Sequence, residues 1–122
     1  MKLDLQIQYS IIINTPKPTI MNLEIINNKG VFEIHGDFVN EHTNRVATYF
    51  NRLLDRYYEI VICLEHVKQV DETAINVMRF IASKAKRRGK TLFVLGNENK
   101  RIHDQFNKAN LISVFRNDYD FK

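Results

Sequence analysis

The residues best placed for chemistry are Asp71, Glu72 and Thr73, two carboxylates and a hydroxyl that directly precede an apolar, helix-like stretch. Paired carboxylates can act as a general acid and a general base when both reach the same reacting group. Adjacent residues at the start of a helix diverge, however, and no nucleophile or further base accompanies these two. We therefore expect Asp71 to be the N-cap of the helix, and we predict that the chain is not an enzyme.

Other residue types that commonly carry chemistry do not form a recognisable pattern. The chain has four histidines, namely His35, His42, His66 and His103. They show no metal-ligand spacing, and the one cysteine, Cys63, lies within an apolar stretch, where a small buried residue is the ordinary case. Glycine occurs four times and nowhere as a phosphate-binding loop. We therefore predict no metal site and no cofactor.

The acidic turn must be positioned by the elements on either side of it. Two short apolar stretches, residues 60–64 and 91–95, flank the helix that the turn opens. Short apolar strands on both sides of an amphipathic helix are typical of a β-α-β unit, in which the two strands are parallel neighbours. We expect the helix to end near Arg88, because Gly89 follows a basic last turn.

The faces of this helix predict a surface next to Thr73. At 100° per residue, one stripe is apolar and should pack on the sheet; it consists of Ala74, Val77, Met78, Ile81 and Ala85. A second row points away from that stripe and consists of Thr73, Asn76, Phe80 and Lys84. Phe80 is either a contact with a neighbouring helix or an exposed anchor for a partner. The predicted partner-binding residues are Asp71, Glu72, Thr73, Asn76, Phe80 and Lys84.

The remaining pattern predicts an α/β domain with a mixed sheet of four to five strands and helices mainly on one face. Residues 22–26 and 31–34 form an expected hairpin around an Asn- and Gly-containing turn. The next helix, capped by Asn40 or Thr43, should bury Val46, Phe50, Leu53 and Tyr57. A third helix, capped by Asn97 or Asn99 and ending at Asn110, should bury Ile102, Phe106 and Ala109. Residues 111–115 are predicted to be a last short strand.

The two ends of the chain differ from this domain, which we place at residues 21–116. Residues 3–13 alternate between apolar and polar side chains, which predicts a strand, and Pro16 and Pro18 make the linker that follows stiff and extended. The segment 1–20 is an extra edge strand, an arm that pairs with a second molecule in a homodimer, or a consequence of translation that truly starts at Met21. Residues 117–122 are a polar tail.

Composition limits the classes of protein to consider. The 122 residues suit one domain, and 44% hydrophobic and 26% charged residues are an ordinary globular mixture. No apolar run reaches the ~18 residues that span a bilayer, and the first residues do not resemble a secretion signal, so we expect a cytoplasmic protein. The net charge of +4 is spread out, and the basic run at residues 84–90 lacks interleaved aromatic residues, so we predict no direct nucleic-acid partner.

Several short motifs occur in a recognisable order. They are Gly36, the run Val70, Asp71, Glu72, Thr73 and Ala74, then Arg88, Gly89 and Lys90, and finally Ala109, Asn110, Leu111 and Phe115. In this order and spacing the chain resembles a STAS domain, the fold of bacterial anti-sigma factor antagonists, over residues 21–115. The central motif of that family is an aspartate, a small polar residue, a serine or threonine, and a glycine or alanine. Asp71, Thr73 and Ala74 match it, whereas Glu72 departs from it.

The resemblance implies a partner-switching phosphoprotein that regulates transcription. Its partner would be an anti-sigma factor that is also a serine/threonine kinase with a histidine-kinase-like ATPase fold. By match to the motif, Thr73 would be the phosphorylated residue, phosphorylation would release the partner, and a phosphatase would reset the switch. A hydroxyl on the first turn of a helix suits this role, because the helix dipole favours a phosphate there.

Two alternatives stay open at this stage. Thr73 can serve only as a helix cap, and the carboxylate of Glu72 beside it favours that possibility. Some STAS domains are non-phosphorylated accessory subunits of ABC-type membrane transport assemblies, in which the same helix docks on an ATPase. The sequence therefore predicts a regulatory protein-binding module and leaves its partner undecided.

Overall fold

The computed structural model describes residues 23–120, so the predicted strand at residues 3–13 and its proline linker lie outside the described residues. The elements in chain order are β1 (Leu23–Asn28), β2 (Val31–Phe38), α1 (Asn40–Arg56), β3 (Glu59–Cys63), β4 (Val67–Val70), α2 (Glu72–Arg87), β5 (Thr91–Leu95), α3 (Lys100–Lys108) and a 3₁₀ helix (Ile112–Val114). Apart from β4 and the last element, this order is the predicted one.

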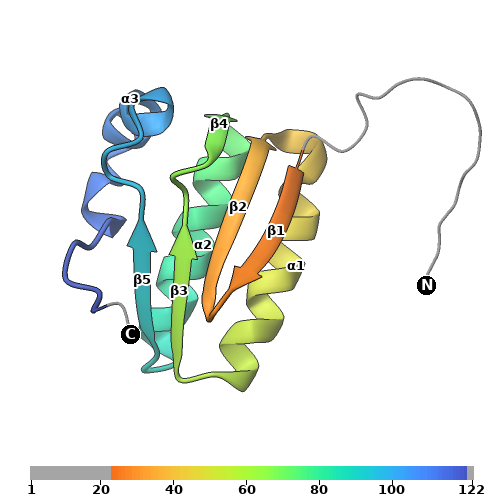
Figure 1. The fold of residues 1–122 in the computed structure, drawn as a ribbon, viewed down its shortest axis with the longest axis vertical. Helices are drawn as coiled ribbons and strands as arrows, with labels where there is room; N and C mark the ends of the chain where they lie inside the picture. Colours follow the sequence, from red (N-terminus) through yellow and green to blue (C-terminus); the bar gives the residue numbers. More distant parts are fainter. Residues whose placement is uncertain (1–22, 121–122) are drawn as a thin grey trace, which may run out of the picture.

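The strands form one mixed sheet, which confirms the predicted fold class (Figure 1). Its order is β1-β2-β3-β5, and β4 pairs with β2 away from that path. The β1–β2 hairpin is antiparallel and the other pairings are parallel. β3 and β5 are neighbours in register from Glu59↔Thr91 to Cys63↔Leu95, so the predicted β-α-β unit around α2 is confirmed.

β4 is a strand that the sequence pattern did not predict. It is possible because β2 is long enough to have two parallel partners in succession. Val31, Phe32 and Glu33 pair with β3, whereas Gly36, Asp37 and Phe38 pair with β4. β4 has only four residues and the middle two are exposed, so it lacks a pattern that distinguishes it from a loop.

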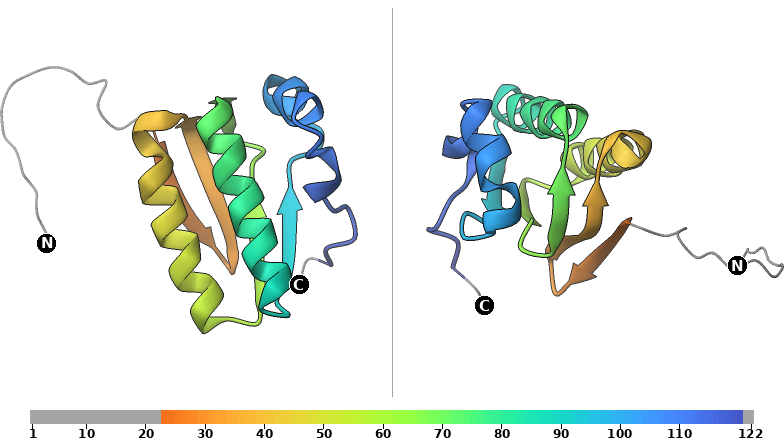
Figure 2. Two further views of the ribbon diagram at one scale, coloured as in Figure 1. Left: turned by 180° about the vertical axis from the view of Figure 1, so that it is seen from behind. Right: turned by 90° about the horizontal axis from the view of Figure 1, so that it is seen from above.

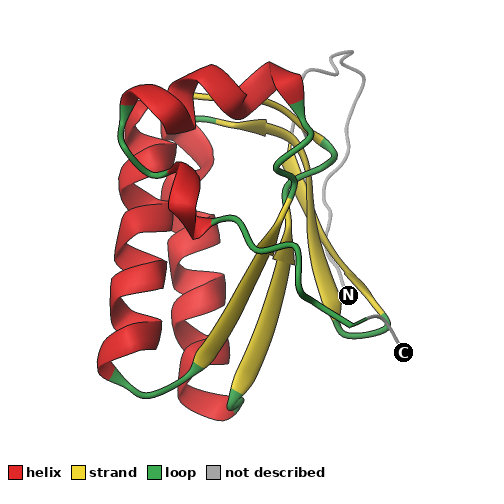
Figure 3. Ribbon diagram, turned by 90° about the vertical axis from the view of Figure 1, so that its left-hand side faces the viewer, coloured by secondary structure: helices red, strands yellow, loops and turns green. Residues whose placement is uncertain are grey.

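The helices lie mainly on one face of the sheet, as predicted. Figures 2 and 3 show α1 and α2 side by side against this face, while α3 packs at one edge, near β4 and the 3₁₀ helix. Between the two layers lies a continuous apolar core, whose largest fully buried side chains include Phe38, Phe50, Phe106, Ile62, Met78 and Ile81. α2 buries Ala74, Met78, Ile81 and Ala85 as predicted, together with Ile75, while Val77 is half-buried.

Hydrogen bonds confirm the predicted C-terminal ends of both α2 and α3. After α2, Gly89 has a φ of +66°, and the N–H of Lys90 donates to the carbonyl of Ala85 over 2.8 Å. After α3, Asn110 has a φ of +56°, and the N–H of Leu111 donates to the carbonyl of Phe106 over 2.9 Å. These are the bonds of the Schellman motif, which requires a left-handed residue just past the helix.

The prediction that residues 111–115 form a strand is wrong. They contain the 3₁₀ helix, and only Phe115 makes an isolated parallel bridge, to Val94 of β5. Apolar residues at positions 111, 112, 114 and 115 fit one helical turn as well as a short strand, because a short apolar run does not distinguish the two. The Asn110 turn decides the outcome, since it directs these side chains onto the core.

Two residues depart from the predicted buried face of α1: Leu53 is half-buried and Tyr57 is exposed. We expected Tyr57 on the buried face of α1, but α1 ends at Arg56 and Tyr57 is 48% exposed at its C-cap. Its backbone is extended, with a φ of −118°, because the chain turns there toward β3. Tyr57 therefore lies just past the helix, where the helical spacing no longer applies. Val46 and Phe50, which lie within the helix, are fully buried as predicted.

We predict that Gly96→Ala destabilises the fold more than Gly89→Ala. Both glycines have positive φ values, but a Cβ at Gly96 would lie 3.1 Å from the backbone carbon of Leu64, whereas one at Gly89 would meet no atom within 4 Å. The extra cost should be about 1–3 kcal/mol, the usual range for overpacking. Urea unfolding of the two variants measures it, and equal costs would show that the contact at Leu64 relaxes freely.

Candidate functional site

Asp71 joins the N-terminal ends of the two helices that cover the sheet. It follows β4 directly and precedes α2, as the predicted N-cap. Its Oδ1 accepts hydrogen bonds from the N–H of Ala74, over 3.0 Å, and from the hydroxyl of Thr73, over 2.7 Å. Its Oδ2 accepts one from the N–H of Asn40, the first residue of α1, over 2.8 Å. One carboxylate therefore serves donors of both helices.

The prediction that Asn40 or Thr43 caps α1 is wrong, because Asp71 takes that role. The N-cap position is Val39, which has no side-chain hydrogen bond, and the hydroxyl of Thr43 donates to the carbonyl of Asn40. The free N–H at the start of α1 is instead bound by Asp71, a residue 31 positions away. Only the pairing of β2 with β4 brings the two together, and a local capping pattern does not contain that information.

The hydrogen bonds keep Asp71 ionised. Partial burial raises the pKa of its carboxyl, but the bonds from Thr73, Ala74 and Asn40 outweigh this effect and leave the pKa below its usual value. The positive ends of α1 and α2 also favour a negative charge at this position. The corner of the molecule thus holds a fixed carboxylate with donors on three sides.

Thr73 lies on the first turn of α2, where its side chain is half-buried. Its hydroxyl proton points to Asp71, so the oxygen keeps lone pairs for an incoming group. A carboxylate that already accepts a hydroxyl proton can act as a general base when that oxygen attacks an electrophile. The bond to Asp71 therefore holds the Thr73 hydroxyl in one orientation at the start of α2.

The predicted row beyond Thr73 is only partly exposed. Asn76 is exposed and Phe80 is 45% exposed, and the acidic neighbour Glu72 is exposed as well. These residues are three or four positions apart on α2 and so form one continuous strip. We call Glu72, Thr73, Asn76 and Phe80 together the Thr73 surface.

The prediction that Lys84 belongs to an outward-facing row of α2 is wrong. Lys84 is only 6% exposed, and its ammonium reaches across to α1, where it binds the Asn51 side chain and, over 3.2 Å, Oδ1 of Asp55. The helical wheel placed it on the flank of α2, which is the side that α1 covers, and the apolar stem of a lysine can lie between two helices. Hydrogen bonds from Lys84 and Arg88 hold the pKa of Asp55 below its usual value.

A groove that the sequence did not predict borders the Thr73 surface. It has a volume of about 380 Å³ and lies between α2 and α3, where it is lined by Glu72, Ile75, Asn76, Arg79, Gln105, Lys108 and Ala109. Arg79 links its two sides, because its guanidinium donates to the carbonyl of Ala109 over 2.8 Å. Gln105 and Lys108 of α3 and Ala109 at its C-cap form the second side of this groove, so no helical pattern within α2 could have revealed it.

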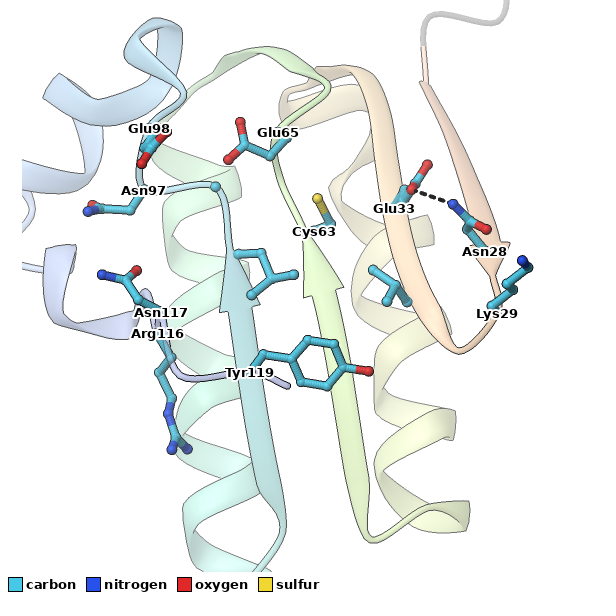
Figure 4. Close-up of a pocket in the computed structure, with 13 residues that line it drawn as sticks. Asn28, Lys29, Glu33, Cys63, Glu65, Asn97, Glu98, Arg116, Asn117 and Tyr119 are labelled. Carbon is cyan, nitrogen blue, oxygen red and sulfur yellow. Dashed lines mark hydrogen bonds between the residues drawn. The ribbon is translucent and has the colours of Figure 1, made fainter. Parts of the chain in front are cut away.

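A second hollow lies on the face of the sheet away from α1 and α2. It has a volume of about 660 Å³, and Figure 4 shows Tyr119 lying across β3 and β5 at its border, with the Cys63 thiol inside it. The Tyr119 ring lies 5.1 Å from that of Phe93, so this part of the predicted polar tail packs on the sheet. Burial raises the pKa of the Cys63 thiol and so favours its protonated form.

Comparison with known proteins identifies the family. The model of the STAS domain family matches residues 21–120, which include every described residue. No curated protein matches the chain. Among residues 23–120, no helix combines the length and the apolar character that crossing a membrane requires.

We predict that Asp71→Asn lowers the free energy of unfolding by about 1–2 kcal/mol at pH 7, because it removes a charged cap shared by two helices. The pKa of Asp71 is lower in the folded state than its unfolded value of roughly 3.9, so its contribution is complete above about pH 5 and is lost as the pH falls through the folded pKa. The difference between variant and wild type should therefore shrink below about pH 4.

Urea unfolding between pH 3 and pH 7 measures this difference. The matched control is Asp104→Asn, which changes an exposed aspartate on α3 and should cost no more than ~0.5 kcal/mol at any pH. A cost of Asp71→Asn that is the same at every pH would contradict the charged-cap interpretation.

Proposed function

Because the chain belongs to the STAS domain family, whose members are regulatory or binding modules, we propose that it binds a protein partner through the Thr73 surface and that phosphorylation of Thr73 releases that partner. The observation that carries the proposal is the hydrogen bond of the Thr73 hydroxyl to ionised Asp71, at the shared N-terminal ends of α1 and α2. This contact orients the hydroxyl oxygen and supplies a base for its proton.

The proposed partner is an anti-sigma factor that is a serine/threonine kinase with a histidine-kinase-like ATPase fold. The resemblance to anti-sigma factor antagonists supports this class, and it also implies a phosphatase that removes the phosphate. The same kinase would then bind the unmodified Thr73 surface and modify it. The chain itself acts as the substrate and the binding partner, not as the catalyst.

The switch follows from charge. A phosphate on Thr73 removes the proton that Thr73 donates to Asp71 and adds about 1.5–2 negative charges. Asp71 and exposed Glu72, the two residues before Thr73, already carry negative charge. They would repel the phosphate, and only the helix dipole would favour it. A partner surface that accommodates the neutral hydroxyl would lose its complementarity when that charge appears.

Phe80 supplies the apolar part of the same surface. Its ring is 45% exposed, although it lies on the flank of α2 that also carries buried Lys84. The neighbouring helix α1 therefore covers Phe80 only partly. An exposed aromatic ring bordered by polar residues is a common centre of binding energy in protein interfaces, which supports the anchor role.

A non-phosphorylated accessory subunit of an ABC-type transport assembly is the second candidate function. The observation that favours it is Glu72, an exposed carboxylate where the family motif has a small polar residue. With a permanent negative charge beside Thr73, the surface charge would differ less between the unmodified and the phosphorylated protein. In this case the Thr73 surface would dock on an ATPase and Thr73 would serve only as part of the Asp71 cap.

Copurification of the full chain from its native cell, followed by mass spectrometry, separates the two candidates. A histidine-kinase-like kinase that binds with micromolar or better affinity supports the switch, and transporter subunits support the accessory role. Mass spectrometry of the recovered chain also reports whether Thr73 carries a phosphate. The partner identified in this way is the one used in the two binding measurements below.

We predict that Thr73→Glu abolishes partner binding with the fold intact, because it places a permanent charge beside Asp71. Thr73→Ala should retain binding but resist release by the kinase, since it has no hydroxyl to modify. Thr48→Glu is the matched control, because Thr48 is an exposed threonine on α1. Isothermal calorimetry measures binding and circular dichroism verifies folding. Undiminished binding by folded Thr73→Glu would eliminate the switch and leave the accessory role.

We predict that Phe80→Ala weakens partner binding by ~2 kcal/mol or more, the scale of an interface hot spot. Tyr58→Ala is the control, because Tyr58 is 72% exposed at the opposite ends of α1 and α2, far from Thr73. The same calorimetric titration compares the two variants. Equal affinity of Phe80→Ala and wild type would show that the ring lies outside the interface.

A further inference from the structure

Three potential metal ligands meet on the face of the sheet that α1 and α2 leave uncovered. Glu33 and His35 are two positions apart on β2, so both side chains point to this face, and His66 belongs to the turn between β3 and β4. The carboxylate oxygen and the ring nitrogens of these residues all lie within 4.8 Å of one another. The spacing of the histidines along the chain did not predict a metal site. His35 and His66 are 31 positions apart, and only the pairing of the strands brings them together.

The backbone that carries these ligands is fixed by the sheet. The N–H of Gly36, next to His35, donates to the carbonyl of His66 over 3.1 Å, so the turn is attached to β2. The rings of His35 and His66 are stacked, with centroids 4.4 Å apart and planes inclined by 14°. Nε2 of His35 lies 2.8 Å from Oε1 of Glu33. Both histidines and the carboxylate are therefore adjacent before any ion binds.

We propose that Glu33, His35 and His66 bind a divalent transition-metal ion of the Zn²⁺ class. Two imidazoles and one carboxylate are a common donor set for such ions, whereas Mg²⁺ and Ca²⁺ prefer oxygen ligands throughout. Nitrogen and oxygen ligands lie about 2.0–2.2 Å from Zn²⁺, which places them roughly 3.3–3.5 Å from each other in a tetrahedral site. The two stacked rings must first turn out of their nearly parallel planes so that a nitrogen of each faces the ion, and water would complete the coordination.

The ion would stabilise a particular point of the fold. At Gly36 and Asp37 the register of β2 shifts, and β2 exchanges β3 for β4 as its parallel partner. His66 comes from the turn that makes this exchange possible, so a metal bridge from β2 to His66 would fasten the junction. β4 leads directly into Asp71, but Glu33 and His35 alternate along β2 with buried Phe32 and Ile34, so they point to the face of the sheet away from α2. This site is independent of the Thr73 surface.

His66 distinguishes a metal site from a simple hydrogen-bonded pair. The contact between Glu33 and His35 does not require His66, whereas a three-ligand site does. Loss of an outer-shell partner of a metal ligand already costs about 10–100-fold in affinity. Replacement of His66, a ligand itself, should therefore weaken Zn²⁺ binding at least ~tenfold.

The test is isothermal calorimetry of the full chain with ZnCl₂ at pH 7.5, with MgCl₂ as the comparison. We expect one saturable Zn²⁺ site, at least ~tenfold weaker binding for His66→Gln and for His35→Gln, and unchanged binding for the control His103→Gln on α3. Zn²⁺ should also raise the Tm of the wild type and of His103→Gln, and should raise that of His66→Gln less at the same ZnCl₂ concentration. Circular dichroism establishes that each variant is folded.

The opposite results would overturn the proposal. These are the absence of saturable Zn²⁺ binding by the wild type, equal affinity of folded His66→Gln and wild type, or Mg²⁺ binding as tight as that of Zn²⁺. If His66→Gln does not fold, Glu33→Gln provides the same comparison, because it keeps the size of the side chain and removes the carboxylate. None of these measurements uses the protein partner, so failure here leaves the proposed function unaffected.

Discussion

The ionised carboxylate of Asp71 is the constraint on which the functional end of the molecule depends. It accepts hydrogen bonds from the hydroxyl of Thr73 and from the N–H groups of Ala74 and Asn40. Donors at the start of a helix have no partner within the helix, so each must find one elsewhere. By serving both helices, Asp71 sets where α1 and α2 begin relative to each other and aims the hydroxyl on which the proposed switch rests.

This arrangement is a consequence of strand pairing. Phe38 at the end of β2 pairs with Val70 at the end of β4. Because the strands are parallel and end at the same level, the helices that follow them also begin at the same level. β4 is short and half-exposed, yet without it Asp71 would not reach Asn40. The inserted turn that separates β3 from β4 therefore serves the site on one face and brings His66 to His35 on the other.

A polar cluster joins the other ends of the same two helices. Asp55 of α1 accepts from buried Lys84, over 3.2 Å, and from exposed Arg88, over 2.9 Å. A buried ammonium is tolerated only when its hydrogen bonds are made, and Asn51 completes them. α1 and α2 are thus fixed at both ends. Phe80, which is 45% exposed, lies between the two attachments, so the Thr73 surface is presented on a pair of helices that is joined near both ends.

The amino-acid sequence alone determined the features that are local to one element. The alternation and length of apolar runs predicted β3, β5 and α2, and single residues predicted the Asp71 cap and the turns at Gly89 and Asn110. These features depend on backbone preferences and on which face of an element avoids water, and both are written in neighbouring residues. The Asp-Glu-Thr motif and the order of elements were sufficient for the resemblance to the STAS family.

Only the tertiary structure decided the contacts between residues far apart in the chain. The sharing of Asp71 with Asn40, the burial of Lys84 against Asp55, and the stacking of His35 on His66 join residues about 30 positions apart. A helical wheel shows that Lys84 leaves the core stripe, but not that α1 covers the flank it points to. Histidine spacing along the chain is likewise uninformative when the ligands come from β2 and from a turn. Such contacts depend on which elements become neighbours, and that choice is made by the packing of the whole domain.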